Sequence, residues 1–94
     1  MQEDLTGRIV RSKAGRDKGR RFVVVGCADE AHVLIADGSL RKAGKPKRKK
    51  LMHLSFESAV VEGLDAELNA HGATADAFIR KALKETCQHH DADD

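Results

Sequence analysis

The sequence predicts a mainly β (α+β) fold, a small and strongly bent antiparallel barrel with a helical C-terminal extension. Over residues 1–54, short apolar runs alternate with polar and glycine-containing segments, a pattern typical of short strands joined by turns. From residue 64 onward the apolar residues take helical spacing instead. We therefore expect a barrel over residues 1–54 and a linker with a helical extension over residues 55–94.

Short segments of the first half are expected to form the strands of the barrel. In chain order they are Leu5–Arg11, Phe22–Gly26, His32–Ala36, Ser39–Lys42 and Leu51–Leu54. The dipeptide Asp37-Gly38 predicts a two-residue type I′ turn, because this turn needs positive φ at both central positions. Residues 27–31 are expected to form another turn, and residues 55–63 show no pattern that assigns them a structure.

Two helices are expected in the second half of the chain. The first covers Leu64–Ala70 and ends at Gly72, a residue type common just after helix C-termini. In the second, Thr74 has the place of an N-cap, and Asp76 in the first turn interacts favourably with the helix dipole. We expect its apolar face to pack on the barrel or on the first helix, with partner docking as the alternative. The residues of this face are Ala75, Phe78, Ile79, Ala82 and Leu83.

The long polar loop between the first two strands concentrates positive charge. Its basic residues are Lys13, Arg16, Lys18, Arg20 and Arg21. Gly15 and Gly19 can take positive φ and let the backbone approach a partner closely. We expect Asp17 to hydrogen-bond backbone N–H groups and hold the shape of the loop, rather than to contact a ligand. The loop is thus predicted to bind a polyanion, and the alternative is a solvated turn.

A second basic segment, Arg41–Lys50, holds seven Lys/Arg in ten residues. Gly44 and Pro46 interrupt regular structure, so we expect an extended, mobile arm in the free protein. A phosphate backbone would relieve the mutual repulsion of these charges and release counterions, whereas the alternative is an idle, solvated arm. The residues predicted to contact RNA here are Arg41, Lys42, Lys45, Lys47, Arg48, Lys49 and Lys50.

The two halves of the chain carry charges of opposite sign. Residues 1–54 hold 14 Lys/Arg and 6 Asp/Glu, a net charge of +8, and residues 55–94 hold 3 and 9, a net charge of −6. A basic module joined to an acidic appendage favours a polyanionic partner for the basic half.

The stretch Ser12–Gly19, S-K-A-G-R-D-K-G, followed by a hydrophobic strand, resembles a KOW motif. Many KOW motifs have a third glycine where this chain has Phe22, a departure that favours a bacterial KOW-domain RNA-binding family over the elongation-factor type. That family is related to archaeal and eukaryotic large-subunit ribosomal proteins, and Leu34–Lys42, Lys45–Leu51 and Ile79–Lys84 also resemble it. The resemblance implies an SH3-like barrel and a structured ribosomal RNA target. The alternative is a protein-interaction module that docks on the transcription or translation machinery.

The few aromatic residues narrow the kind of RNA recognition. The chain has no Trp or Tyr, and its three Phe residues lie largely in apolar patterns. It therefore lacks aromatic platforms on which splayed bases would stack, and we expect readout of a folded RNA by charge and shape. No basic recognition helix for sequence-specific DNA reading is visible.

Other function classes find little support in the sequence. Cys27, Cys87 and the histidines match no zinc-ligand spacing, and no nucleophile with an orienting base can be argued. We expect no enzyme activity, no metal or other cofactor and no small-molecule substrate. Two cysteines without close spacing indicate a reducing cytoplasm, and no apolar run is long enough to cross a membrane.

Overall fold

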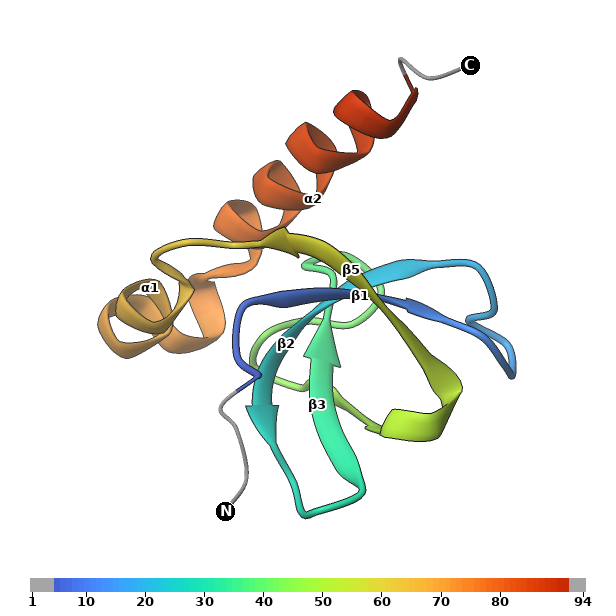
Figure 1. Cartoon of the computed structure of the whole chain (residues 1–94). Coiled ribbons are helices and arrows are strands. Elements are labelled where there is room, and N and C mark those ends of the chain that lie inside the picture. The colour runs from blue at the N-terminus through green and yellow to red at the C-terminus, as the bar shows by residue number, and fades with distance from the viewer. Residues whose placement is uncertain (1–4, 92–94) are drawn as a thin grey trace.

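The computed structural model describes residues 5–91, with side chains placed for residues 5–72 and 74–86. Its elements are, in chain order, β1 (Arg8–Ser12), β2 (Arg21–Cys27), β3 (His32–Ala36), β4 (Lys47–Lys50), the 3₁₀ turn η1 (Leu51–His53), β5 (Leu54–Val60), α1 (Leu64–His71), the 3₁₀ turn η2 (Gly72–Thr74) and α2 (Asp76–Asp91). The described chain is an α+β fold with one five-stranded antiparallel sheet and two α-helices, which confirms the predicted class at this level (Figure 1).

The sheet has the strand order β4-β3-β2-β1-β5, so its two edges are consecutive strands of the sequence. The short turn η1 connects these edges. Register shifts between Arg8 and Val10, and between Val24 and Gly26, mark bulges, which bend strands and increase their twist. Figure 1 shows the resulting sheet curled rather than flat. Within the described residues it remains an open sheet, because β4 and β5 do not pair with each other.

Side chains of the central strands fill two cores, one on each face of the sheet. In β1, Ile9 enters one core and its neighbour Val10 enters the other, as the two-residue period of a strand requires. In β2, Val23 joins Ile9, while Phe22 and Val24 join Val10. Because both faces are covered, β2 reads as a continuous apolar run in the sequence rather than as an alternating one.

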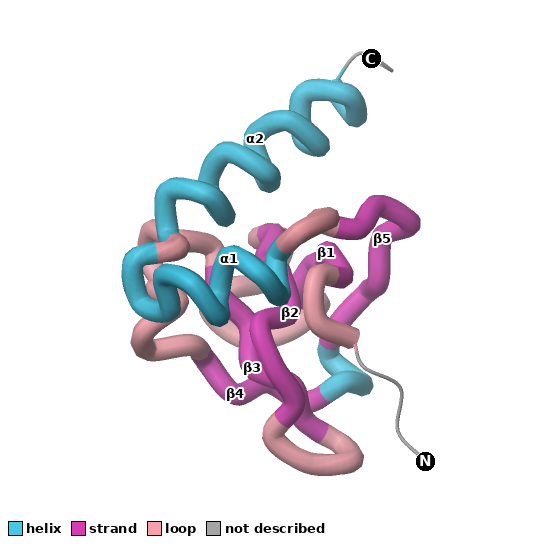
Figure 2. Tube along the Cα trace, turned by 90° about the vertical axis from the view of Figure 1, so that its left-hand side faces the viewer, coloured by secondary structure: helices cyan, strands magenta, loops and turns pink. Residues whose placement is uncertain are grey.

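Both helices pack on the face of the sheet that carries Ile9, and α2 then extends away from the sheet toward its C-terminal end (Figure 2). Leu64 of α1 and Ile79 of α2 are fully or almost fully buried in this core. Ala75 is also buried, and Phe78, Ala82 and Leu83 pack against the same cluster, which confirms the predicted apolar face. Helix α1 ends at His71, one residue later than predicted, and Gly72 is its C-cap, as predicted.

The segment Ser39–Lys42 is not a strand, which corrects the prediction made from Asp37-Gly38. The carboxylate of Asp37 accepts hydrogen bonds from the backbone N–H groups of Ser39 and Arg41, both at 2.9 Å. The backbone N–H groups of Asp37 and Gly38 both donate to the carbonyl of Arg41. These bonds close a wider loop in place of the two-residue hairpin, since an aspartate can satisfy nearby N–H groups that would otherwise belong to a strand ladder.

Two predictions are wrong here: the mobile arm over Arg41–Lys50 and the closing strand over Leu51–Leu54. Lys47–Lys50 is strand β4, which pairs with β3, and Leu51–His53 is a 3₁₀ turn. The last strand, β5, begins only at Leu54. It pairs with β1 largely through residues after 54, to which the sequence assigned no structure. The sheet therefore extends past residue 54, the boundary expected between barrel and extension. Cross-strand pairing to β3 outweighs the low strand propensity of lysine, as tertiary context often does.

At the start of α2, Thr74 does not have the N-cap role that the sequence predicted. Thr74 belongs to η2 and its hydroxyl donates to the carbonyl of His71, so it is not the N-cap of α2. Asp76 lies in the first turn as predicted, but its carboxylate accepts a hydrogen bond from the distant backbone N–H of Ala43. Neither described helix combines the length and apolar character needed to span a membrane.

Candidate nucleic-acid interface

The two basic segments lie against each other, joined by the carboxylate of Asp17. This residue is only 5% exposed, although it belongs to a loop of charged residues. Its Oδ2 accepts from Nζ of Lys47 at 3.1 Å and from Nη2 of Arg41 at 3.2 Å. The prediction that Asp17 binds backbone N–H groups is therefore wrong about its partners. Its carboxylate fastens the first basic segment to the second.

The charge of Asp17 is stabilised by these two partners. Burial acts to raise the pKa of the carboxyl group, but hydrogen bonds and charge from Lys47 and Arg41 outweigh it and lower the pKa below its ordinary value of 3.8. Asp17 is therefore a carboxylate at neutral pH, and the contact is a charge-assisted one.

Strand alternation decides which cations of β4 reach the loop. Lys47 and Lys49 are the register partners of the buried residues Ile35 and Val33, so they point to that face of the sheet. There Lys47 reaches Asp17, and Nζ of Lys49 donates to the carbonyl of Ala14 at 3.1 Å. The loop is thus seated on one face of the edge strand.

The other two cations of β4 point to the opposite face. Arg48 contacts Oδ2 of Asp29 at 2.9 Å, and Nδ1 of His32 lies 2.8 Å from Oδ1 of the same carboxylate. The hydrogen bond to His32, followed by that from the backbone N–H of Ala31, lowers the pKa of Asp29 to about 2. Lys50 lies opposite His32 in the register and is exposed.

The loop between β1 and β2 has an ordered backbone. Gly15 and Gly19 have φ of +81° and +88°, which confirms that both occupy conformations favouring glycine. The N–H of Gly19 donates to the carbonyl of Ser12 at 2.8 Å, and the N–H of Arg20 donates to that of Asp17 at 2.9 Å. These bonds fix the turn that presents the side chains of its tip, Arg16 and Lys18, to solvent.

We call the exposed cations of the two segments the basic surface. They are Lys13, Arg16, Lys18, Arg20, Lys42, Lys45, Arg48 and Lys50. Two of these cations have ion-pair partners: Nη2 of Arg20 lies 3.8 Å from Oδ2 of Asp37, and Arg48 pairs with Asp29. The other six have no ion pair with the side chains that the structure places. Arg41, Lys47 and Lys49 lie beneath this surface and hold its two parts together.

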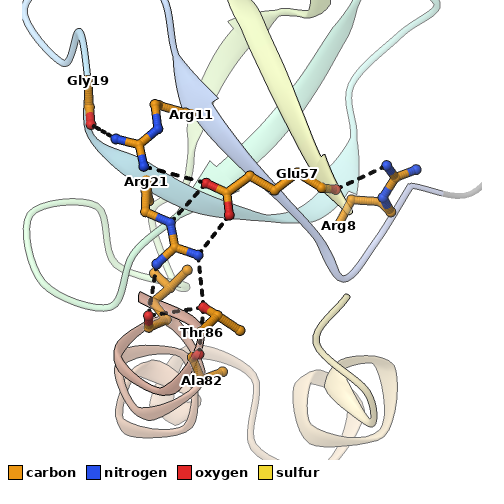
Figure 3. Close-up of polar contacts among 8 residues, drawn as sticks. Arg8, Arg11, Gly19, Arg21, Glu57, Ala82 and Thr86 are labelled. Atoms are coloured by element: carbon orange, nitrogen blue, oxygen red, sulfur yellow. Dashed lines mark hydrogen bonds and ion pairs between the residues drawn. The ribbon is translucent and has the colours of Figure 1, made fainter. Parts of the chain in front are cut away.

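Arg21, also predicted to bind RNA, is turned toward Glu57 and α2 (Figure 3). Its side chain is 12% exposed and forms two hydrogen bonds of 2.9 Å with the carboxylate of Glu57. It also donates to the carbonyl of Leu83 at 2.9 Å and to the hydroxyl of Thr86 at 2.8 Å. Arg21 therefore connects the sheet to α2.

Two histidines, which the sequence offered only as possible metal ligands, lie beside the basic strand β4. His32 and His53 line a shallow hollow of about 420 Å³ together with Lys47, Arg48, Lys49 and Lys50. The pairing of His32 with Lys50 would have been visible had β4 been assigned as the strand next to β3. Among the placed side chains, no three His, Cys, Asp or Glu gather where a metal ion could be held.

No family model matches the chain, and no match was found among the curated proteins.

Proposed function

We propose that this protein binds RNA through the basic surface and catalyses no reaction. One observation carries the proposal. Asp17 holds together two cationic segments that lie far apart in the sequence, while six exposed cations of these segments have no ion pair with the placed side chains. Gathering like charges costs free energy in the free protein, and a polyanion offsets that cost by neutralising charge and releasing counterions.

The aromatic residues support recognition of folded RNA rather than of splayed bases. Phe22 is fully buried, and Phe56 and Phe78 pack against the two cores. Because the chain has no Trp or Tyr, it offers no exposed aromatic ring on which a base could stack. A hydrogen-bonded loop and an edge strand, both cationic, suit the phosphates of a structured RNA.

The resemblance of Ser12–Gly19 to a KOW motif directs the proposal to ribosomal RNA of the large subunit, in the cytoplasm. The curled sheet, with β1 between β2 and β5 and its edges joined by η1, supports an SH3-like barrel as the finer description of the fold. The competing function is a protein-interaction module that docks on the transcription or translation machinery. Copurification of RNA with the protein at low salt would favour RNA binding over the protein-interaction module.

Salt dependence of RNA binding tests the proposal directly. If about five phosphates are neutralised, log K against log salt concentration has a slope of roughly −3.5 to −4.5. The measurement is a titration of a fluorescent structured RNA at several salt concentrations. A slope near zero, or no binding at low salt, would contradict the proposal.

A matched pair of variants separates this surface from general positive charge. Arg16→Ala/Lys18→Ala removes two exposed cations of the loop tip, and Lys81→Ala/Lys84→Ala removes two cations of α2. We expect the first pair to weaken binding and to make the salt slope shallower by about 1.4–1.8. The second pair should leave both quantities close to those of the parent protein. Equal losses in the two variants would mean that RNA binds by net charge alone.

A further inference from the structure

Helix α2 contacts both segments that form the basic surface. At its first residue, Oδ1 of Asp76 accepts a hydrogen bond from the N–H of Ala43 at 2.7 Å. One turn later, Nη1 of Arg80 donates to the carbonyl of Gly38. Further along, the carbonyl of Leu83 and the hydroxyl of Thr86 accept from Arg21, where the first basic segment enters β2.

The loop after β3 is seated on α2 through its backbone. Gly38 has a φ of +78°, and a Cβ atom built there would clash with the backbone oxygen of Asp76 and lie 2.9 Å from Cγ of Arg80. Such an approach leaves no space for a side chain between loop and helix. The position of Gly38 is therefore set by the helix surface.

A continuous series of hydrogen bonds leads from this contact to the first basic segment. The N–H of Gly38 donates to the carbonyl of Arg41, and the N–H of Arg41 donates to the carboxylate of Asp37. The guanidinium of Arg41 then reaches Asp17 in the loop between β1 and β2. Helix α2, the loop after β3 and the first basic segment are thus physically connected.

We propose that α2 positions the basic surface for RNA, with Asp76 and Arg80 as positioning residues; this inference rests on the proposed function. Lys42 and Lys45 lie close to Ala43 in the chain, and neither has an ion pair with the placed side chains. Their location depends on the backbone that Asp76 holds at Ala43. Without that bond, this stretch must be ordered when RNA binds, which lowers affinity by about fivefold or more.

Two neutral substitutions of Asp76 separate positioning from charge. Asp76→Asn removes the negative charge but keeps an oxygen that accepts from Ala43, whereas Asp76→Ala removes both. Loss of the charge alone should leave binding as tight as in the parent protein, or tighter, because RNA is an anion. We expect Asp76→Ala to bind about fivefold more weakly than Asp76→Asn. The salt slope should be the same in both variants, since neither removes a cation.

Amide hydrogen exchange measures the same contact without RNA. The amide of Ala43 should exchange faster in Asp76→Ala than in Asp76→Asn, while the amides of β1 and β2 stay equally protected in both. Arg80→Ala serves as a second variant if Asp76→Ala does not fold. Its charge-matched control is Lys81→Ala, because both positions are exposed and Arg80 is the one that contacts Gly38. We expect Arg80→Ala to bind more weakly than this control.

The outcomes distinguish this inference from the proposed function. If the parent protein binds RNA with the expected salt slope but the two Asp76 variants bind equally, α2 does not position the surface and the RNA-binding function stands. If the parent protein binds no RNA, the proposed function fails, and the positioning role of Asp76 fails with it. Weaker binding by Asp76→Ala, with rescue by asparagine and an unchanged salt slope, supports positioning.

Discussion

Two carboxylates, Asp17 and Glu57, each bind cationic side chains, but with different structural results. Asp17 pairs with Arg41 and Lys47, and the basic surface lies above this contact. Glu57 pairs with Arg21 at 2.9 Å and with Arg11 at 3.7 Å, beside α2 (Figure 3). The Asp17 cluster holds two cationic segments together, whereas the Glu57 cluster joins a helix to a sheet. The difference shows that the carboxylate an arginine pairs with decides whether that arginine supports the basic surface, as Arg41 does, or joins helix and sheet, as Arg21 does.

Replacing Asp17 with Asn should have the largest combined effect on stability and binding. The amide keeps the size of the side chain but loses two charge-assisted contacts, and we expect the free energy of unfolding to fall by about 1–2 kcal/mol. RNA affinity should also fall because the uncharged amide oxygen holds Lys47 and Arg41 less strongly, although the protein becomes more positive. Denaturant unfolding and RNA titration measure the two effects. Tighter RNA binding would show that net charge matters more than the arrangement.

The matching substitution Glu57→Gln tests the other half of the comparison. It removes the charge that holds Arg21 and Arg11, so we expect a loss of about 1 kcal/mol in the free energy of unfolding. RNA affinity should stay the same or rise slightly, because Glu57 does not hold the basic surface together. The same two measurements apply. A loss of affinity as large as that of Asp17→Asn would erase the distinction between the two clusters.

A methyl group at Gly19 should have a smaller effect, confined to the backbone of the loop. Apart from Gly19 and its two chain neighbours, no heavy atom of the described residues lies within 4 Å of the Cβ position, so the cost of Gly19→Ala comes from φ of +88°. We expect about 1 kcal/mol of destabilisation. Gly19→Asn should restore part of this stability, because asparagine tolerates left-handed φ better. Thermal unfolding of both variants is the measurement, and equal stability of parent and Ala variant would contradict the assigned φ.

The smallest expected effect is in the pH dependence of stability. The pKa of Asp17 is lower in the folded protein, so its contribution is present above the unfolded pKa near 3.8 and is lost as the pH falls through the folded value. The stability difference between the parent protein and Asp17→Asn should therefore be constant near neutral pH and shrink below about pH 4. Unfolding curves for both proteins from about pH 7 to about pH 3 measure it. A difference that grows on acidification would reverse the assigned direction.

Local patterns in the sequence predicted much of the fold. The apolar run of β2 and the helical spacing around Ile79 depend only on near neighbours, and both predictions were confirmed. The sequence also showed that Gly15 and Gly19 can take positive φ, and both do so in the structure. The partners of Arg21 were not predictable, because Glu57 lies 36 positions away in the sequence and Thr86 lies 65 positions away.

Strand β4 escaped prediction for a different reason. Its sequence, K-R-K-K, has no apolar residue to mark a strand face, and its partner β3 supplies the structure through backbone pairing. Without this strand, the contacts of Lys47 and Lys49 with the loop could not be predicted, because they follow from the alternation of side chains along β4. The basic segments themselves were visible, but their arrangement depended on pairing between strands.

The position of β4 at the edge of the sheet has a consequence for self-association. Edge strands expose backbone N–H and C=O groups to which a strand of another molecule can add. Pairing of two β4 edges would bring their lysines and arginines close together, and repulsion between like charges opposes it. The cations of β4 thus disfavour the pairing of two copies of the protein through this edge.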